Sequence, residues 1–271
     1  MRLVTIRTPD GTQAARLDAD RIVPLDAPDV AAVLEAGIGA VPEAGPSIET
    51  ADADLAPLIS RPSKIICLGL NYRSHIEEMG AELPAHPTLF AKFPSALIGA
   101  RDPIHLPEAS NAVDWEGELA FVIGRRVRNA SNDEAADAIA GYTICNDVSM
   151  RDWQWRTTQW LQGKTWENST PLGPALVTPD EVDNAADLLL RCEVDGEVMQ
   201  EARTSDLLFK PVAIVSYVST ITTLEPGDVF STGTPGGVGA GMQPPRFLRP
   251  GQVVRTSIEG LGELVNECVK S

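Results

Sequence analysis

Residues 114–124 read Asp-Trp-Glu-Gly-Glu-Leu-Ala-Phe-Val-Ile-Gly, and this stretch says most about the fold. Its apolar second half is typical of a β-strand, in which side chains alternate between the two faces. The alternation places Glu116 and Glu118 on the same face. Two carboxylates one strand repeat apart repel each other unless a cation lies between them or one of them is protonated. An edge strand with both acids in water explains the pair more simply, so a metal site needs further ligands.

A third carboxylate, Asp147, lies at the end of another largely apolar strand, within residues 142–149. Together with Glu116 and Glu118 it would form a set of hard oxygen ligands without Cys or His, which suits Mg²⁺, Mn²⁺ or Ca²⁺ better than Zn²⁺. Three protein ligands leave about half of an octahedral shell for water or a chelating substrate. The three carboxylates together therefore predict a site for a catalytic divalent ion.

His75 and Glu78 form a second candidate pair, in a segment that reads as a strand end followed by one or two helical turns. Their i, i+3 spacing makes them neighbours on a helix face, where the carboxylate can hold the imidazole and raise its basicity. The pair could therefore act as a general base. The same spacing is common on surface helices that have no catalytic role, so this alternative stays open. His86 and His105 lack such a partner, and we expect them in loop or packing roles.

Two segments could hold an anion. Residues 163–166 offer Lys164 in an otherwise uncharged run, and residues 231–239 offer backbone amides and hydroxyls in a Gly-rich turn after a short strand. The Gly-rich run at residues 231–239 contains no lysine and so lacks the Gly-Lys-Ser/Thr end of a nucleotide P-loop, which argues against phosphate binding of that kind. A cradle for a carboxylate remains open, and simple chain reversal is the alternative for the Gly-rich turn.

The chain as a whole reads as a β-rich α+β protein. Short strands with Gly and Pro turns dominate from residue 64 onward, and helical segments are few, so a doubly wound parallel sheet is not expected. Residues 1–60 read as a small N-terminal α/β cap domain of short strands and one short helix. A boundary near Arg61 would leave residues 61–271 as the catalytic domain.

Composition narrows the classes of partner and the compartment. The 22 Lys and Arg residues against 38 Asp and Glu give a net charge of −16, which disfavours nucleic acid and anionic membrane surfaces as partners. No secretory signal is recognisable, and no apolar run approaches the roughly 20 residues that span a bilayer. The four cysteines are widely spaced, and we expect them to be reduced and mostly buried. We therefore expect a cytoplasmic protein with a small-molecule substrate.

Taken together and in this order, the motifs resemble those of the fumarylacetoacetate hydrolase family from Lys64 to Asn266. The matching segments are residues 69–75, 89–99, 114–124, 145–154, 162–166, 194–200, 231–239 and 244–251. The resemblance implies a mixed β-sandwich roll as the larger domain. It also implies that Glu116, Glu118 and Asp147 hold one Mg²⁺ or Mn²⁺ ion.

The resemblance further implies roles for the remaining site residues. His75 and Glu78 match a dyad on a mobile lid that activates water, and Lys164 matches a lysine near the metal. Further residues match positions that hold the keto-acid end of the substrate or lie at the edge of the site: Arg151, Gln154, Thr234 and Lys92. At Lys92 the spacing departs from the family pattern, because Phe93 separates it from the following proline.

The implied reaction is hydrolysis of a C–C bond in a β-diketo acid, such as fumarylpyruvate or another acylpyruvate from the degradation of aromatic compounds. A metal-stabilised enolate of pyruvate would leave after hydroxide attacks the distal carbonyl. The same site would permit oxaloacetate decarboxylation or isomerisation of a 2-oxo acid. An inactive metal-binding domain is a third reading, which the joint presence of His75, Glu78 and Lys164 opposes. The sequence does not define the acyl group.

A homodimer is expected from the same resemblance. The sequence adds a cluster of four tryptophans, Trp153, Trp155, Trp160 and Trp166, in a region that also carries Arg151 and Lys164. Aromatic side chains at this density belong either to a core or to an interface.

Overall fold

The main body of the protein is a mixed β-sheet, seen in a computed structural model that describes residues 1–78, 80 and 82–271, without the side chain of Glu78. The sheet has 11 strands. Ten of them follow in spatial order: β4 (Ile48–Glu49), β3 (Arg21–Pro24), β2 (Gly11–Asp18), β1 (Arg2–Thr8), β13 (Thr170–Val177), β11 (Ile139–Asn146), β10 (Gly117–Ile123), β16 (Val229–Ser231), β5 (Ile65–Gly69) and β6 (Thr88–Lys92). The eleventh, β7 (Leu97–Ile98), pairs in parallel with β13.

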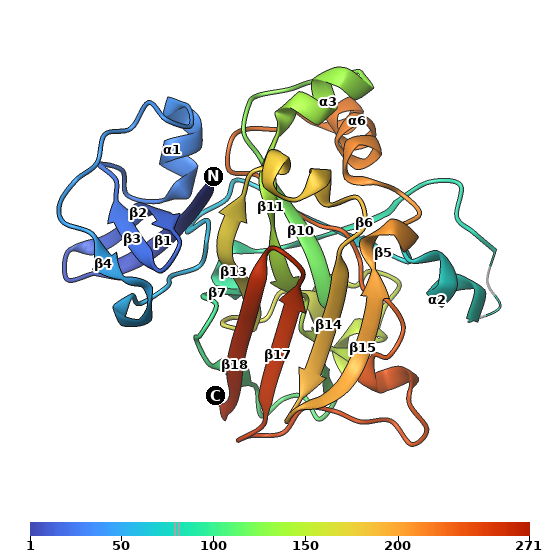
Figure 1. Cartoon of the computed structure of the whole chain (residues 1–271). Coiled ribbons are helices and arrows are strands. Elements are labelled where there is room, and N and C mark those ends of the chain that lie inside the picture. Colours follow the sequence, from blue (N-terminus) through green and yellow to red (C-terminus); the bar gives the residue numbers. More distant parts are fainter. Residues whose placement is uncertain (79, 81) are drawn as a thin grey trace.

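A second sheet packs against the first. Its five strands, in spatial order, are β15 (Glu197–Arg203), β14 (Leu189–Val194), β17 (Val253–Ile258), β18 (Gly262–Lys270) and β8 (Ile104–Leu106). Figure 1 shows β14, β15, β17 and β18 across the front of the molecule, with β10 and β11 behind them. Leu190 and Ile258 from this sheet share one hydrophobic cluster with Phe121 of β10. A two-strand ladder of β9 (Val113–Asp114) and β12 (Ser149–Met150) completes the strands.

Strand β10 lies in the middle of the large sheet, between β11 and β16. Every residue of β10 is buried. Leu119 and Phe121 join one hydrophobic cluster, whereas Ala120 and Val122 join another, so apolar side chains cover both faces. The simpler reading of residues 114–124 as a solvated edge strand is therefore excluded.

In the described part of the chain, six short α-helices connect the strands: α1 (Val30–Ala36), α2 (Arg73–Glu78), α3 (Asn132–Ala138), α4 (Arg151–Gln154), α5 (Leu161–Lys164) and α6 (Pro211–Ile221). Single-turn 3₁₀ helices cover residues 50–52, 94–96, 179–181, 183–185, 204–206 and 239–241. Helix α3 begins with a capping box between Ser131 and Glu134, and α6 begins with Pro211. The two helices lie side by side at the top of Figure 1. The helical turns expected around His75 are present as α2.

The N-terminal region forms the lobe at the left of Figure 1. Its expected strands and helix correspond to β1, β3 and α1, and β2 lies between the two strands. Strand β1 pairs with β13 through Arg2 and Leu3, so the lobe continues the large sheet. A division into residues 1–60 and 61–271 stays a prediction. The prediction of a β-rich α+β fold is confirmed.

Two expectations from composition can be compared with the structure. All four cysteines are buried and without disulfide bonds, as expected. Among the described residues, no helix is both long and apolar enough to cross a membrane.

Candidate active site

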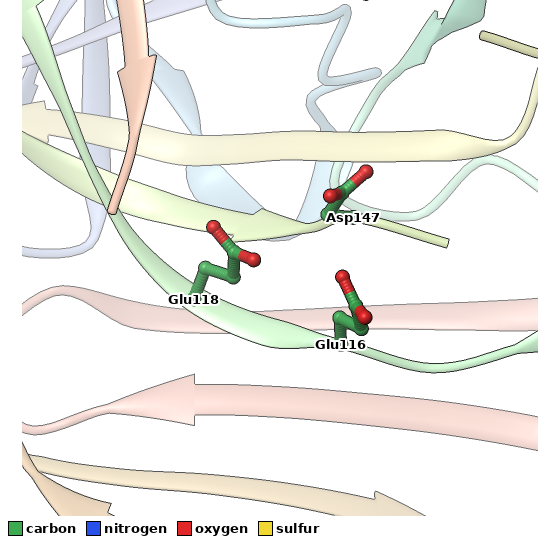
Figure 2. Close-up of side chains that lie close together, drawn as sticks. All are labelled: Glu116, Glu118 and Asp147. Atoms are coloured by element: carbon green, nitrogen blue, oxygen red, sulfur yellow. The ribbon is translucent and has the colours of Figure 1, made fainter. Parts of the chain in front are cut away.

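Three carboxylates meet at the junction of β10 and β11. Glu116 immediately precedes β10, Glu118 lies within it, and Asp147 immediately follows β11. The strands are antiparallel, and the backbone N–H of Asp147 donates to the carbonyl of Glu116 at 2.9 Å. One ligand oxygen from each carboxylate lies within 4.8 Å of the others. Figure 2 shows the three side chains next to one another, so the predicted triad is brought together by strand pairing.

The glycine between the two glutamates allows the second sheet to approach closely. A Cβ on Gly117 would lie 3.1 Å from the Thr256 side chain and 3.2 Å from Cβ of Cys192. Both neighbouring side chains are buried and have little room to move. A side chain here would push the strand and its flanking carboxylates away from β14 and β17.

Buried cations hold two of the three carboxylates. Lys164 Nζ lies 2.5 Å from Glu116 Oε2 and 2.8 Å from Asp147 Oδ2. Lys92 Nζ donates to Asp147 Oδ1 at 2.5 Å, and Arg151 Nη2 lies 2.6 Å from Glu116 Oε1. The result is an alternating row of charges that fixes both carboxylates in place.

Glu118 is held differently, by neutral donors. Its Oε2 accepts hydrogen bonds from Ser231 Oγ at 2.5 Å and from the Gly233 N–H at 2.8 Å. Burial raises the pKa of Glu118 well above its usual range, and the charges of Asp147 and Glu116 raise it further. For Asp147, burial opposes ionisation, but the ammonium groups of Lys164 and Lys92 outweigh it and lower the pKa to about 2.

The balance of charge favours an additional cation. With all groups ionised, the cluster has four acids and three bases: Asp114, Glu116, Glu118 and Asp147 against Arg151, Lys164 and Lys92. The excess of one negative charge disfavours the ionised form of Glu118 in particular. Because the ligand atoms are hard carboxylate oxygens in a buried setting, the residues fit a divalent ion such as Mg²⁺ or Mn²⁺.

A pocket of about 540 Å³ opens onto this cluster. Glu116, Glu118, Arg151 and Lys164 line its inner side, and His75 of α2 also lines it. The predicted substrate residues Gln154 and Thr234 belong to the lining too. The pocket thus joins carboxylates, cations and an imidazole around one space, which is the arrangement that acid–base chemistry on a chelating substrate requires.

Helices α4 and α5 bring Arg151, Gln154 and Lys164 together. A Cβ on Gly163 would lie 2.5 Å from Cβ of Gln154 and 2.7 Å from its backbone nitrogen, so only glycine permits this contact. Arg151 Nη1 also donates to Gln154 Oε1 at 2.9 Å. The Gly-Lys pair that the sequence marked as suited to anions thus seats the lysine against the carboxylates.

Lys92 and Glu78 differ from the other predicted site residues. Lys92 has a fully buried side chain that contacts Asp147 and the carbonyl of Val148, and it is not part of the pocket lining. A direct role of Lys92 in substrate binding stays a prediction. Helix α2 carries both members of the predicted dyad, but the side chain of Glu78 lies outside the described residues. The dyad therefore also stays a prediction.

Sequence reasoning missed the buried amides that support the site. Gln200 of β15 accepts from the Gly117 N–H at 2.9 Å and donates to Thr234 Oγ1 at 2.8 Å, so one amide joins the carboxylate strand to the Gly-rich turn. Asn146 Oδ1 accepts from the Glu116 N–H at 3.0 Å. Neither residue has a local signal in the sequence, because each acts on backbone that is distant along the chain or across a strand pair.

Asp114, which begins the motif of residues 114–124, is a further support of the site that the sequence does not predict. Its carboxylate accepts from Arg151 Nε at 2.8 Å and from the backbone N–H groups of Gly239 and Ala240. It therefore anchors Arg151 beside Glu116 and closes the turn that follows residue 231. Burial disfavours the charged guanidinium of Arg151, but Glu116 and Asp114 outweigh this and raise its pKa.

Comparison with known proteins places this site in a family. The family model described as "Fumarylacetoacetate (FAA) hydrolase C-terminal" matches residues 64–269. The protein named oxaloacetate tautomerase fahd2, mitochondrial, of Xenopus laevis is 48% identical over 217 residues, which are 79% of this chain and 68% of that protein. The human protein named oxaloacetate tautomerase FAHD2A, mitochondrial, is 45% identical over 79% of this chain and 69% of its own length. The cytoplasmic location expected from the sequence stays a prediction.

Solved structures agree over the whole chain. A 5-carboxymethyl-2-hydroxymuconate delta-isomerase from Mycobacterium smegmatis is 37% identical with a TM-score of 0.84, and each chain is covered completely. A fumarylacetoacetate hydrolase from Exiguobacterium antarcticum is 33% identical with a TM-score of 0.87, again with complete coverage of both chains. The resemblance inferred from the motifs is confirmed, and the chain belongs to the fumarylacetoacetate hydrolase family.

Proposed function

We propose that this chain is a metal-assisted enzyme that interconverts the keto and enol forms of a small 2-oxo acid, with oxaloacetate as the first substrate to test. The observation that carries the proposal is the pocket in which two glutamates of the triad, two cations and His75 line one space. The names of the curated relatives, oxaloacetate tautomerases, favour oxaloacetate.

Each group has a task in such a reaction. A Mg²⁺ or Mn²⁺ ion held by Glu116, Glu118 and Asp147 would polarise the ketone and spread the charge of the enolate. Arg151 and Lys164, which line the pocket beside Glu116, would orient the carboxylate of the substrate. The imidazole of His75 would accept a proton from the carbon next to the ketone, and a proton returned to the ketone oxygen would give the enol. No atom is gained or lost overall.

Hydrolysis of an acylpyruvate is the second candidate, although the sequence alone placed it first. His75 would then accept a proton from water, and the hydroxide would attack the distal carbonyl and break the C–C bond. The solved hydrolase from E. antarcticum, with its TM-score of 0.87, favours this candidate. Identity is higher to the tautomerases, at 45–48%, than to that hydrolase, at 33%, which is why enolisation comes first here. Decarboxylation of oxaloacetate would use the same groups.

One experiment separates these reactions. Purified protein with Mg²⁺ or Mn²⁺ is given oxaloacetate and an acylpyruvate, and the ultraviolet absorbance of the enol, the formation of pyruvate and the loss of the acylpyruvate are followed. The proposal predicts faster keto–enol exchange of oxaloacetate, abolished by a chelator, with little pyruvate. Cleavage of the acylpyruvate without any effect on the exchange would contradict the proposal and support the hydrolase.

We also infer that the chain forms a homodimer with the tryptophan-rich segment near the contact. Trp155, between α4 and α5, is 65% exposed, and Phe93, whose N–H donates to Thr165 Oγ1 directly after α5, is 51% exposed. Large apolar side chains exposed together are typical of interfaces. Sedimentation velocity at micromolar concentration should show a species of twice 29.0 kDa. A species near 29.0 kDa that persists on raising the concentration would contradict this.

A further inference from the structure

The pocket has a second half that the proposed reaction does not use. The carboxylates, Arg151, Lys164 and His75 provide its polar side, whereas the rest of the lining is rich in large apolar side chains. These are Leu68, Leu70, Phe90, Trp155, Trp160, Val238 and Met242. The volume of about 540 Å³ falls in the range of sites for drug-sized ligands of about 300–1,000 Å³, which is more than a four-carbon acid needs.

The rings of Phe90 and Trp160 form an aromatic wall in this half of the pocket, and the wall packs against the sheet. A Cβ on Gly69 would lie 2.3 Å from Cζ3 and 2.7 Å from Cη2 of Trp160, so the indole ring lies directly against the glycine backbone. Trp160 also meets Phe90 edge to face, with ring centroids 5.5 Å apart at 66°. Gly69 ends β5 and Phe90 lies in the neighbouring strand β6, so the sheet itself supports both rings.

The wall begins beside the reacting groups. Lys164 Nζ lies 4.9 Å from the centroid of the Phe90 ring, and the same nitrogen contacts Glu116 and Asp147. Trp160 precedes α5 and lies four residues before Lys164, which places both on one side of that helical turn. A 2-oxo acid held near Lys164 would therefore direct its distal group along Phe90 toward Trp160.

We propose that Phe90 and Trp160, seated on Gly69, form a subsite for a planar or apolar distal group of the substrate. The proposal rests on the function proposed above and extends the substrate class from compact diacids to 2-oxo acids with an aryl substituent. Aromatic rings suit such a group because they offer a large apolar area and favourable stacked or edge-to-face contacts.

A second carboxylate is a poorer occupant of this half. Among the described lining residues, the Arg and Lys side chains are Arg151 and Lys164. The function proposed above assigns both cations to the first carboxylate of the substrate, and each is also paired with two buried acids. A distal carboxylate near Trp160 would lose its hydration without gaining a cation, which is unfavourable.

The test compares a bulky and a compact substrate in matched variants. Phenylpyruvate and oxaloacetate serve as enolisable substrates, while benzoylformate and oxalate serve as unreactive ligands, measured by calorimetry with Mg²⁺ present. In Trp160→Ala we expect the ratio of kcat/KM for phenylpyruvate to that for oxaloacetate to fall about tenfold, the scale of one lost aromatic contact with its buried area. Benzoylformate binding should weaken more than oxalate binding.

Two further variants test whether the effect is specific to the contact between Trp160 and Gly69. Gly69→Ala should lower the same ratio, because the new Cβ must displace the indole ring. Trp166→Ala is the matched control, since Trp166 packs edge to face on Trp153 and does not line this pocket. An unchanged ratio and unchanged benzoylformate affinity in Trp160→Ala, or an equal fall in Trp166→Ala, would overturn the subsite.

The binding measurement separates this proposal from the proposed function. If the wild-type protein enolises neither substrate, the proposed function fails, and the benzoylformate affinities of Trp160→Ala and Trp166→Ala still decide the subsite. If enolisation occurs and the benzoylformate affinity is the same in all variants, the function stands and the subsite falls.

Discussion

Charged side chains form networks in two regions of the molecule, and the two differ in burial. In the N-terminal lobe Arg16 contacts Asp18 and Glu43, each at 2.8 Å, and all three side chains are 30% exposed or more. Around the pocket, Arg151 and Lys164 contact Glu116 at equally short distances, yet none of these side chains is more than 9% exposed. The distances alone do not distinguish the two networks.

The difference shows which network serves function. An exposed ion pair costs little desolvation and contributes about 0–1 kcal/mol to stability. A buried ion pair loses hydration that its internal attraction barely offsets, and a hydrophobic cluster would often be at least as stable. A protein that buries four acids and three bases in one cluster therefore holds them for a task other than stability.

Removal of the imidazole should have the largest effect on the rate. His75→Ala should slow keto–enol exchange by about 10²–10⁴, the usual contribution of a positioned general base. Metal binding and folding should be unaffected, because His75 is not one of the carboxylate ligands. His86→Ala is a matched control, since His86 stacks on Tyr217 with ring centroids 6.0 Å apart and does not line the pocket. Equal rates in His75→Ala and the wild type would refute the role of the imidazole.

Removal of one buried charge should have the largest effect on stability. Asp114→Asn leaves Arg151 beside Glu116 without its second carboxylate, and we expect the free energy of unfolding to fall by about 3 kcal/mol or more. Asp18→Asn removes one partner of the exposed Arg16 and should cost about 1 kcal/mol or less. Urea unfolding of both variants measures the two losses of unfolding free energy. Equal losses would contradict the difference between the buried and the exposed ion pairs.

Removal of a bridging amide should have a smaller effect. Gln200→Met leaves the buried N–H of Gly117 without its acceptor, which should lower stability by about 1–3 kcal/mol. Because Thr234 loses a donor as well, KM should rise by a larger factor than kcat falls. Gln200→Glu keeps an acceptor for Gly117 but adds a buried carboxylate to a cluster that already has an excess of acids, so it should not restore stability. If Gln200→Met has the same unfolding curve and the same KM as the wild type, Gln200 does not support the site.

Much of the site could be predicted from the sequence because its chemistry is local. The spacing of Glu116 and Glu118 on one strand fixes their common face, and Asp147 follows an apolar strand that pairs with it. The solvated edge strand could not be excluded from the sequence, because the partners of β10 lie at residues 139–146 and 229–231. The pattern within one strand does not show which other strands pair with it when those strands are distant along the chain.

The supporting residues could not be predicted for the same reason. Gln200 and Asn146 are ordinary polar residues in their own strands, and their partners are backbone groups that only the folded sheets bring near. The sequence marks Trp160 only as one of four tryptophans in a core or interface, because nothing in it shows that the indole ring contacts Gly69. The short-range sequence pattern thus predicts the metal ligands well. The residues that hold these ligands in place depend on long-range packing.

The central claim is that Glu116, Glu118 and Asp147 hold one divalent ion, and calorimetric titration with Mn²⁺ tests it most directly. We expect one Mn²⁺ site per chain in the wild type. Loss of an outer-shell partner typically weakens metal binding by about 10–100-fold. Because Glu118 is a direct ligand in this proposal, we expect Glu118→Gln to weaken Mn²⁺ binding by more than that. Glu201→Gln, at an exposed acid that pairs with Arg191 on the second sheet, should bind Mn²⁺ as the wild type does. Equal Mn²⁺ affinity in Glu118→Gln and the wild type would contradict the account.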